Sequence, residues 1–507
     1  MNRMKRFLVN GLLITAVSLL LRMVGVAYNV YLSRVIGAVA IGLFSLISTV
    51  YGFAVTLATS GIGLATTRLV ASAVGREGER SSAVRCTVRK CFAYALFFSA
   101  ISTLLLFFLA PAIGRGLLED ERCVLPLRFL ALSLVPISLS SVLSGYFIAV
   151  RRVYKNAVTQ VLAQGARIFG CIFLLGLFSD KSVEGACIAI ALGGTIAEGV
   201  GLLLQWLLFL AERKRLRGDS LSLAQGKEIQ RQLTSTALPV ACSAYVRSAL
   251  ITVEHMLIPR GLERSGASRD LSLAAYGTVH SMVFPLVLFP AAISSSFAGL
   301  LIPEVTEAFT EGNRARIERI IGRVFSCVLT YAIGTAGIML SFAYPLAEVI
   351  YPEAEGAGRY ILMIAPLIPV MYLDTSVDAI LKGLGEQFYC MMVNIVDSLL
   401  SVILVWVLLP KMGITGYILT VYFTETVNAA LSIARLIYVA RVRVRWFSWL
   451  IRPLISVMAA TALTALLIRG LEISVTTAPA LTVQLVLCAS IYLLAVFCMK
   501  KSHQEKS

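Results

Sequence analysis

Charged side chains are scarce in this sequence. Only 14% of its 507 residues are charged, against about 25% in soluble domains. A soluble fold of this length needs more polar surface than that to cover its core. The mean hydropathy of +0.84 and recurring apolar runs of about 20 residues, the length that crosses a bilayer, therefore predict an integral membrane protein.

Residues that carry chemistry are equally few. The three histidines, His255, His280 and His503, belong to no H-E-x-x-H motif, and the chain has neither a G-x-x-x-x-G-K-[ST] loop nor a dinucleotide fingerprint. None of the ten cysteines forms a C-x-x-C pair, and most lie inside apolar runs as small buried hydrophobes. We expect no catalytic residues, no metal centre and no cofactor, and hence a protein that is not an enzyme.

Apolar runs make up most of the chain. Marking them between polar breaks predicts about fourteen membrane-spanning helices, and thus an all-α polytopic membrane protein. The predicted spans are 7–32, 38–74, 88–113, 125–150, 155–178, 185–211, 233–258, 272–307, 320–350, 358–382, 387–409, 414–440, 448–469 and 479–499.

The basic residues between these runs set the expected orientation. With a cytoplasmic N-terminus, most of the 45 lysines and arginines fall on the cytoplasmic side, as the positive-inside rule requires. We expect a multi-pass protein of the cell membrane with both termini in the cytoplasm. Short basic clusters between spans explain the net charge of +17 without nucleic acid as a partner.

The chain repeats itself at an offset of about 231 to 236 residues. Val135-Pro136 in the fourth span corresponds to Ile368-Pro369 in the tenth, and the span order is the same in both halves. Because six spans per repeat is an even number, both halves keep one orientation, which is typical of transporters that alternate access. We predict two parallel six-helix lobes, residues 1–215 and 216–445, followed by two extra helices and a cytoplasmic tail in residues 446–507.

Five polar or basic residues within the spans are candidate substrate contacts: Arg22, Asn29, Arg34, Arg68 and Arg247. A charge in the membrane is costly and needs a partner or a wet cavity. The stripe around Arg22 is Thr15, Ser18, Asn29 and Ser33, and the stripe leading to Arg68 is Thr49, Thr56, Ser60 and Gly63.

Structural roles for these arginines stay open. Arg22 could clamp two helices, Arg68 could snorkel to the interface, Arg247 could pair with Glu254 seven residues later, and Arg34 could be solvated at the outer mouth. In a cavity, however, the guanidinium fork matches a pyrophosphate with two parallel hydrogen bonds. A lipid-linked saccharide pyrophosphate has such a headgroup, with a tail that stays among the membrane lipids.

The intramembrane carboxylates gather late in the chain. Asp374 and Asp378 stand four residues apart on the tenth span, with Asp397 on the eleventh and Glu254 on the seventh. Two carboxylates on one helix face repel each other unless a cation or a proton lies between them. We expect coupling to Na⁺ or H⁺, although Arg247 or helix-breaking backbone could satisfy the same groups instead.

The stretch Arg441-Val-Arg-Val-Arg-Trp-Phe-Ser-Trp449 mixes bases with tryptophans. This composition favours the lipid headgroup layer over nucleic acid. We interpret it as an interfacial anchor.

Two segments resemble a known family. LLRMVGVAYNVYLSRVIGAVAIGLFSLISTVYGF, at residues 20–53, resembles the opening of the polysaccharide-exporter branch of the multidrug/oligosaccharidyl-lipid/polysaccharide flippase superfamily. SGIGLATTRLVASAVGREG, at residues 60–78, is similar to the second-span signature of its sporulation members. The relatives carry Gly-Ile-Pro before a basic residue, whereas Gly61-Ile62-Gly63 precedes Arg68 here.

The resemblance implies a flippase that moves a lipid-linked saccharide outward across the cytoplasmic membrane. In the sporulation branch the cargo would be a peptidoglycan precursor for the spore cortex, and cell-wall synthesis proteins would be partners. The resemblance further implies headgroup contacts at Arg22, Arg34 and Arg68, and a cation site formed by Glu254 with Asp374 or Asp378.

Three other functions remain open. A multidrug extruder of the same fold would favour organic cations, and it usually carries an acid in the first span where this chain has Arg22. A polysaccharide polymerase or ligase would normally use a sizeable outer loop, and none is predicted. A non-transporting scaffold for wall assembly fits the same composition.

Overall fold

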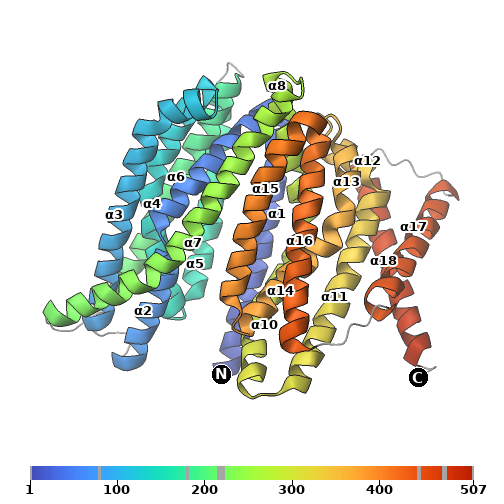
Figure 1. The fold of residues 1–507 in the computed structure, drawn as a ribbon. Coiled ribbons are helices and arrows are strands. Elements are labelled where there is room, and N and C mark those ends of the chain that lie inside the picture. The colour runs from blue at the N-terminus through green and yellow to red at the C-terminus, as the bar shows by residue number, and fades with distance from the viewer. Residues whose placement is uncertain are drawn as a thin grey trace. The chain divides into compact units, whose positions relative to one another are not determined.

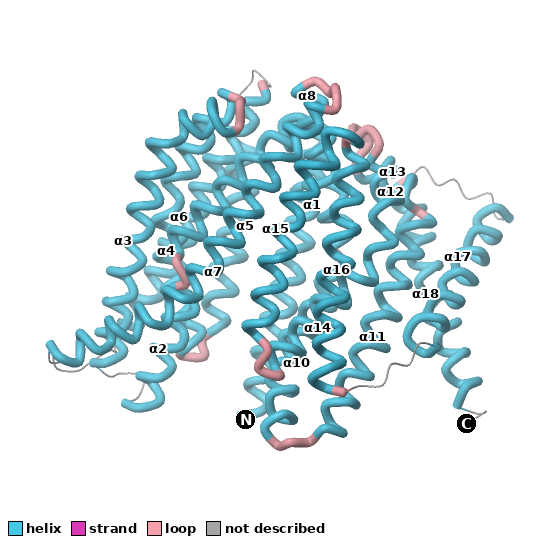
Figure 2. The backbone as a smooth tube through the Cα atoms, in the orientation of Figure 1, coloured by secondary structure: helices cyan, strands magenta, loops and turns pink. Residues whose placement is uncertain are grey.

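The computed structural model describes residues 3–77, 82–177, 182–213, 223–441, 447–470 and 477–504. Every regular element in this part of the chain is a helix, and short loops join the helices (Figure 2). Large apolar side chains such as Phe108 and Phe169, 71% and 74% exposed, face outward where lipid would cover them. The predicted all-α polytopic fold is confirmed.

Twelve helices in the described residues are long and apolar enough to cross a membrane. They correspond to the fourteen predicted runs with two differences. The first two runs are counted together as Leu19–Arg76, and the helix Ile414–Ala440 is not among the twelve. The two runs are separated by Gly37, whose φ of 77° and ψ of 171° break the helical geometry. Glycine adopts this backbone without a Cβ clash.

The chain forms two compact units. Unit 1 comprises Met1–Val24 and Leu43–Met256, and unit 2 comprises Gly25–Gly42 and Leu257–Ser507. The lobe boundaries expected at 215–216 and 445–446 fall outside the described residues. The first helix contributes to both units, and the end of the seventh helix belongs to unit 2, whereas the sequence predicts a single cut between the sixth and seventh spans.

Unit 1 is a bundle of long antiparallel helices (Figure 1). Neighbouring helices approach closely where glycine removes a side chain: a Cβ on Gly193 would lie 2.9 Å from the backbone N of Cys171. The helices are α1 (Arg3–Thr59, in part), α2 (Ile62–Glu77), α3 (Ser82–Ala112), α4 (Val124–Ala149), α5 (Val153–Leu177), α6 (Val183–Arg213) and α7 (Leu223–Arg264, to Met256), with a π-helix at Ile113–Leu117 and a 3₁₀ turn at Glu121–Cys123.

Unit 2 contains more helix breaks than unit 1. Its elements are α8 (Arg269–Gly277), a π-helix (Thr278–Val283), α9 (Phe284–Leu288), α10 (Ala291–Thr310), α11 (Arg314–Ser341), α12 (Ala343–Ile350), α13 (Ala357–Ile364), a 3₁₀ turn (Ala365–Leu367), α14 (Ile368–Gly383), α15 (Gln387–Met412), α16 (Ile414–Ala440), a π-helix (Phe447–Ile451), α17 (Arg452–Gly470) and α18 (Ala478–Gln504).

The last two helices pack against α11 (Figure 1). The Tyr492 hydroxyl donates to the carbonyl of Thr330 at 2.6 Å, and Tyr492 fills the space left by Gly334. A Cβ on Gly337 would overlap a methyl of Val457. The predicted extra helices are therefore integral to unit 2.

Candidate functional site

A seam of polar contacts joins α1 and the turn after it to α7 in unit 1. The α1 residues lie on one helix face, since they are spaced by seven and four, and the α7 residues are spaced by three and four. The contacts are Ser60 Oγ to Tyr245 Oη at 2.5 Å, Thr56 Oγ1 to Ser248 Oγ at 3.3 Å and Thr252 Oγ1 to the Thr49 carbonyl at 3.4 Å. Thr56 and Ser60, two members of the polar stripe that the sequence predicts before Arg68, thus contact α7 through their hydroxyls.

The seam ends at a break between α1 and α2. Ser60 and Gly61 both have positive φ, 44° and 72°. The buried Ser60 hydroxyl also bonds the Tyr94 hydroxyl at 3.1 Å. A Cβ on Gly61 would lie 2.8 Å from the carbonyl of Ala237 on α7. Gly61 therefore serves both the turn and the close approach of α7.

Two of the predicted arginines, Arg68 and Arg247, lie on α2 and α7. Arg68 follows Gly61 by two turns of α2, and Arg247 follows Tyr245 by two residues on α7. Both are exposed, and neither forms an ion pair or hydrogen bond with any residue that the structure describes. The ion pair of Arg247 with Glu254, one of the open alternatives, is not among the contacts of the described residues, and Glu254 has an interaction of its own. The two guanidinium groups are free to bind an anion.

Arg22 and Asn29 lie on α1 but in different units. Arg22 is exposed and Asn29 is half-buried. Within the described part of the chain neither has a hydrogen-bond partner. The structure does not group them with the other candidate contacts.

Arg34 has a structural partner in unit 2. Its Nη2 donates to the carbonyls of Val349 and Ile350, at 2.6 and 3.4 Å. These are the last carbonyls of α12, where a cation complements the helix dipole. Arg34 therefore caps α12, a role that the sequence alone does not indicate because the two segments are more than 300 residues apart.

The three predicted acids of unit 2 lie close together. Asp374 lies within electrostatic range of Asp378 and Asp397 and beside the hydroxyl of Ser432 on α16. Ser432 is buried. Asp378 pairs with Lys382 at 3.2 Å. The Oδ1 atom of Asp374 is buried and accepts no hydrogen bond from a described residue.

This acidic group does not have the geometry of a transition-metal or divalent site. Among the described residues, no three His, Cys, Asp or Glu side chains converge on one point. A monovalent cation or a proton needs fewer charged ligands, and hydroxyl or carbonyl oxygens complete its shell. Glu254, expected to join this group, belongs to unit 1.

Two further acids of unit 1 form ion pairs that were not assigned from the sequence. In unit 1, Arg167 on α5 binds Glu198 on α6 at 2.6 Å. Opposite intramembrane charges on consecutive antiparallel spans are a signal that could have predicted this pair. Glu212, buried at the end of α6, accepts from Arg152 at 2.6 Å and from Lys155.

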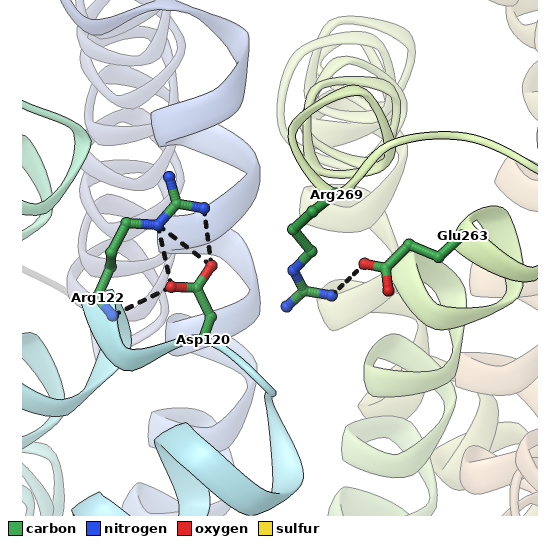
Figure 3. Close-up of polar contacts among 4 residues, drawn as sticks. All are labelled: Asp120, Arg122, Glu263 and Arg269. Atoms are coloured by element: carbon green, nitrogen blue, oxygen red, sulfur yellow. Dashed lines mark hydrogen bonds and ion pairs between the residues drawn. The ribbon is translucent and has the colours of Figure 1, made fainter.

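Ion pairs also fix turns at helix ends, as Figure 3 shows for one pair in each unit. In unit 1, Asp120 caps the 3₁₀ turn by accepting from the Arg122 backbone N at 3.0 Å and binds the same arginine's guanidinium at 2.8 Å. In unit 2, Arg269 binds Glu263 at 2.5 Å across the α7–α8 turn. These arginines are thereby occupied structurally, unlike Arg68 and Arg247.

Two family descriptions match the chain. The one for polysaccharide biosynthesis proteins covers residues 7–309, and the MatE description covers residues 266–407. Stage V sporulation protein B of Bacillus subtilis is 27% identical over 82% of this chain and 80% of its own length. Lipid II flippase MurJ of the same organism is 24% identical over 78% of this chain and 76% of its own length.

Solved structures share the fold. A lipid II flippase MurJ in an inward closed conformation superposes with a TM-score of 0.72 at 11% identity, covering 97% of this chain and 99% of that one. An inward-facing multidrug resistance MATE family transporter superposes with a TM-score of 0.66 at 14% identity, covering 83% of this chain and 96% of that one.

Proposed function

Because the chain belongs to the polysaccharide biosynthesis protein family, we propose that it flips a lipid-linked oligosaccharide or peptidoglycan precursor across the cytoplasmic membrane. The resemblance to the flippase superfamily that the sequence indicates is confirmed. The proposed mechanism is alternating access, which the repeated, equally oriented halves of the sequence support.

The observation that carries the proposal is the pair of arginines on α2 and α7 that have no partner among the described residues. Arg68 and Arg247 are two positive charges in a chain that otherwise neutralises several of its arginines with acids. A pyrophosphate offers each guanidinium two oxygens in the plane of its fork. The seam hydroxyls, such as those of Thr56 and Ser248, suit the sugar hydroxyls that would follow the pyrophosphate.

The relatives support a peptidoglycan precursor as the cargo. One is named a lipid II flippase, and two are named sporulation proteins: stage V sporulation protein B and sporulation protein YkvU of Bacillus subtilis. The proposal therefore includes a role in the spore cortex, in the cell membrane with both termini cytoplasmic, and with cell-wall synthesis proteins as partners.

The proposed driving force is a gradient of Na⁺ or H⁺. Asp374, with Asp378, Asp397 and Ser432 nearby, would take the cation or proton. The buried, unsatisfied Oδ1 of Asp374 supports this, because a bare carboxylate oxygen in the membrane interior is costly.

A multidrug extruder is the second candidate, favoured by the MatE match over residues 266–407. Its cargo would be an organic cation. The arginines of unit 1 oppose this cargo because they would repel it.

The test is flipping of a fluorescent lipid-linked saccharide in proteoliposomes. We expect Arg68→Gln and Arg247→Gln each to slow flipping by about tenfold or more, since each removes a charge-assisted contact. Arg319→Gln, an exposed arginine on α11 that bonds a carbonyl of its own helix, serves as the control and should flip at the wild-type rate. Wild-type flipping in both arginine variants, or transport of organic cations alone, would refute the proposal. Arg22→Gln, tested alongside, decides whether that exposed arginine also contacts the headgroup.

A further inference from the structure

Arg452 at the start of α17 is a nearly buried cation. The residue is 9% exposed. Its Nε atom is buried without a hydrogen-bond partner, and no acidic side chain in the described residues pairs with it. An uncompensated buried charge is costly, so Arg452 requires an anion.

The surrounding helices supply almost no acid. Neither α17 nor α18 contains Asp or Glu, and α11 contains one, Glu318, which is exposed. The sequence from Thr426 to Leu471 is free of acidic residues. The anion for Arg452 therefore comes from outside this group of helices.

The π-helix before Arg452 and the start of α17 pack against α11 and α18. Trp449, 4% exposed, lies against Phe325 of α11 with ring centroids 5.0 Å apart. The Ser456 hydroxyl donates to the Arg452 carbonyl at 2.9 Å and contacts the sulfur of Met499 on α18 at 3.3 Å. The backbone position of Arg452 is thus set by the fold, and its side chain starts from the buried side of α17.

The outward-facing side of the same helix is apolar. Leu454, Ile455 and Met458 on the next turns of α17 are 52%, 47% and 64% exposed, and Phe447 just before Arg452 is 50% exposed. Acyl chains would cover such residues. The segment interpreted from the sequence as an interfacial anchor precedes them, and its residues 442–446 lie outside the described part of the chain.

We propose that Arg452 binds the phosphate of an anionic phospholipid, with the acyl chains lying along the exposed face of α17. A phosphodiester supplies the missing negative charge, and its oxygens accept from the guanidinium fork. A basic pocket between membrane helices beside an apolar face is the arrangement that recognises anionic headgroups. A free phosphate would satisfy the charge but leave the apolar face unused.

The test measures lipid binding to the full chain in detergent. Short-chain phosphatidylglycerol is titrated against phosphatidylcholine, and bound lipid is counted by native mass spectrometry. We expect wild type to prefer phosphatidylglycerol and Arg452→Gln to lose about fivefold in affinity for it, the size of one basic contact at a membrane surface. Arg319→Gln, the matched exposed arginine of α11, should bind like wild type. Equal affinity of wild type for the two lipids, or unchanged binding in Arg452→Gln, would overturn the proposal.

A second measurement separates binding from folding. Phosphatidylglycerol should raise the unfolding temperature of wild type and of Arg319→Gln but not that of Arg452→Gln, a shift that is readable even if this variant starts less stable. If inorganic phosphate at millimolar concentration raises the wild-type temperature equally, the ligand is a free phosphate and the lipid proposal is wrong. No lipid-linked saccharide is used, so the result is independent of the proposed transport function.

Discussion

Arg435 on α16 binds both carboxylate oxygens of Glu386, the residue before α15. Its Nη2 lies 2.9 Å from each oxygen, and its Nε lies 3.1 Å from Oε2. The guanidinium also lies over the rings of Tyr389 and Tyr438, 5.1 and 5.6 Å from their centroids. The α14–α15 turn is thereby tied to α16.

Arg435→Lys should destabilise unit 2 although it keeps the charge. A lysine cannot form the bidentate contact with the carboxylate, and it cannot place a planar guanidinium over the tyrosine rings. We expect a loss of about 1 to 2 kcal/mol, since the pair is partly exposed, seen as a lower unfolding temperature in detergent. Arg319→Lys is the control, and an equal effect in both would show that the fork geometry is unimportant.

The corresponding turn in unit 1 uses the opposite charge placement. There the acid, Glu212, is on α6, and the bases Arg152 and Lys155 are at the α4–α5 turn. Glu212→Gln should cost about 3 kcal/mol or more, because it leaves two half-buried bases without an acid. The measurement is thermal unfolding, with the exposed Glu318→Gln as the neutral control. A Glu212→Gln protein as stable as this control would contradict the assignment.

Gly277 on α8 permits a close helix crossing in unit 2. A Cβ there would lie 2.6 Å from the backbone N of Gly42 and 2.8 Å from the carbonyl of Ala38. Because backbone atoms cannot rotate away, Gly277→Val should force the helices apart and cost about 2 kcal/mol or more. Gly322→Ala on α11, where nothing lies within 4 Å, should be neutral or slightly stabilising. Similar unfolding temperatures for the two variants would argue against the tight crossing.

The fold was largely predictable from the sequence, because a helix must satisfy its own backbone in lipid and needs about 20 apolar residues to cross it. Periodicity also placed Thr56 and Ser60 on one face, and the hydroxyls of both contact α7. What periodicity cannot give is the partner of a face. Nothing local to these residues identifies α7, nearly 200 residues away, as the helix that they contact.

The candidate site was predicted less well for the same physical reason. An intramembrane arginine has the same local sequence whether it caps a helix, pairs with an acid or stays free. Arg34 caps α12, and Arg68 and Arg247 lack partners among the described residues; only the three-dimensional contacts separate these cases. Likewise, assigning Glu254 to the acids of the second half assumed a cut between the sixth and seventh spans, whereas most of α7 joins unit 1.

Arg34→Gln distinguishes a helix cap from a headgroup contact. If its main role is to bind the Val349 and Ile350 carbonyls, the substitution should lower the unfolding temperature, by about 1 kcal/mol in stability. The apparent affinity for the lipid-linked saccharide should then be unchanged, and Arg34→Lys should restore part of the stability. A normal unfolding temperature with weakened saccharide binding would instead place Arg34 at the headgroup.

Asp374→Asn tests the coupling proposal most directly. Asparagine keeps the shape of the side chain but carries no charge, so it mimics a permanently protonated aspartate and cannot gain or lose the proton or hold the cation. We expect wild-type flipping to respond to an imposed Na⁺ or H⁺ gradient, and flipping by the variant to stay at the rate seen without a gradient. Binding of the lipid-linked saccharide, which we assign to the arginines of unit 1, should be unaffected.

Glu318→Gln, which removes an exposed carboxylate from α11, should keep the full response. If flipping by Asp374→Asn still responds to the gradient, the coupling site does not include Asp374. Asp378, which forms an ion pair with Lys382, would then be the next acid to substitute.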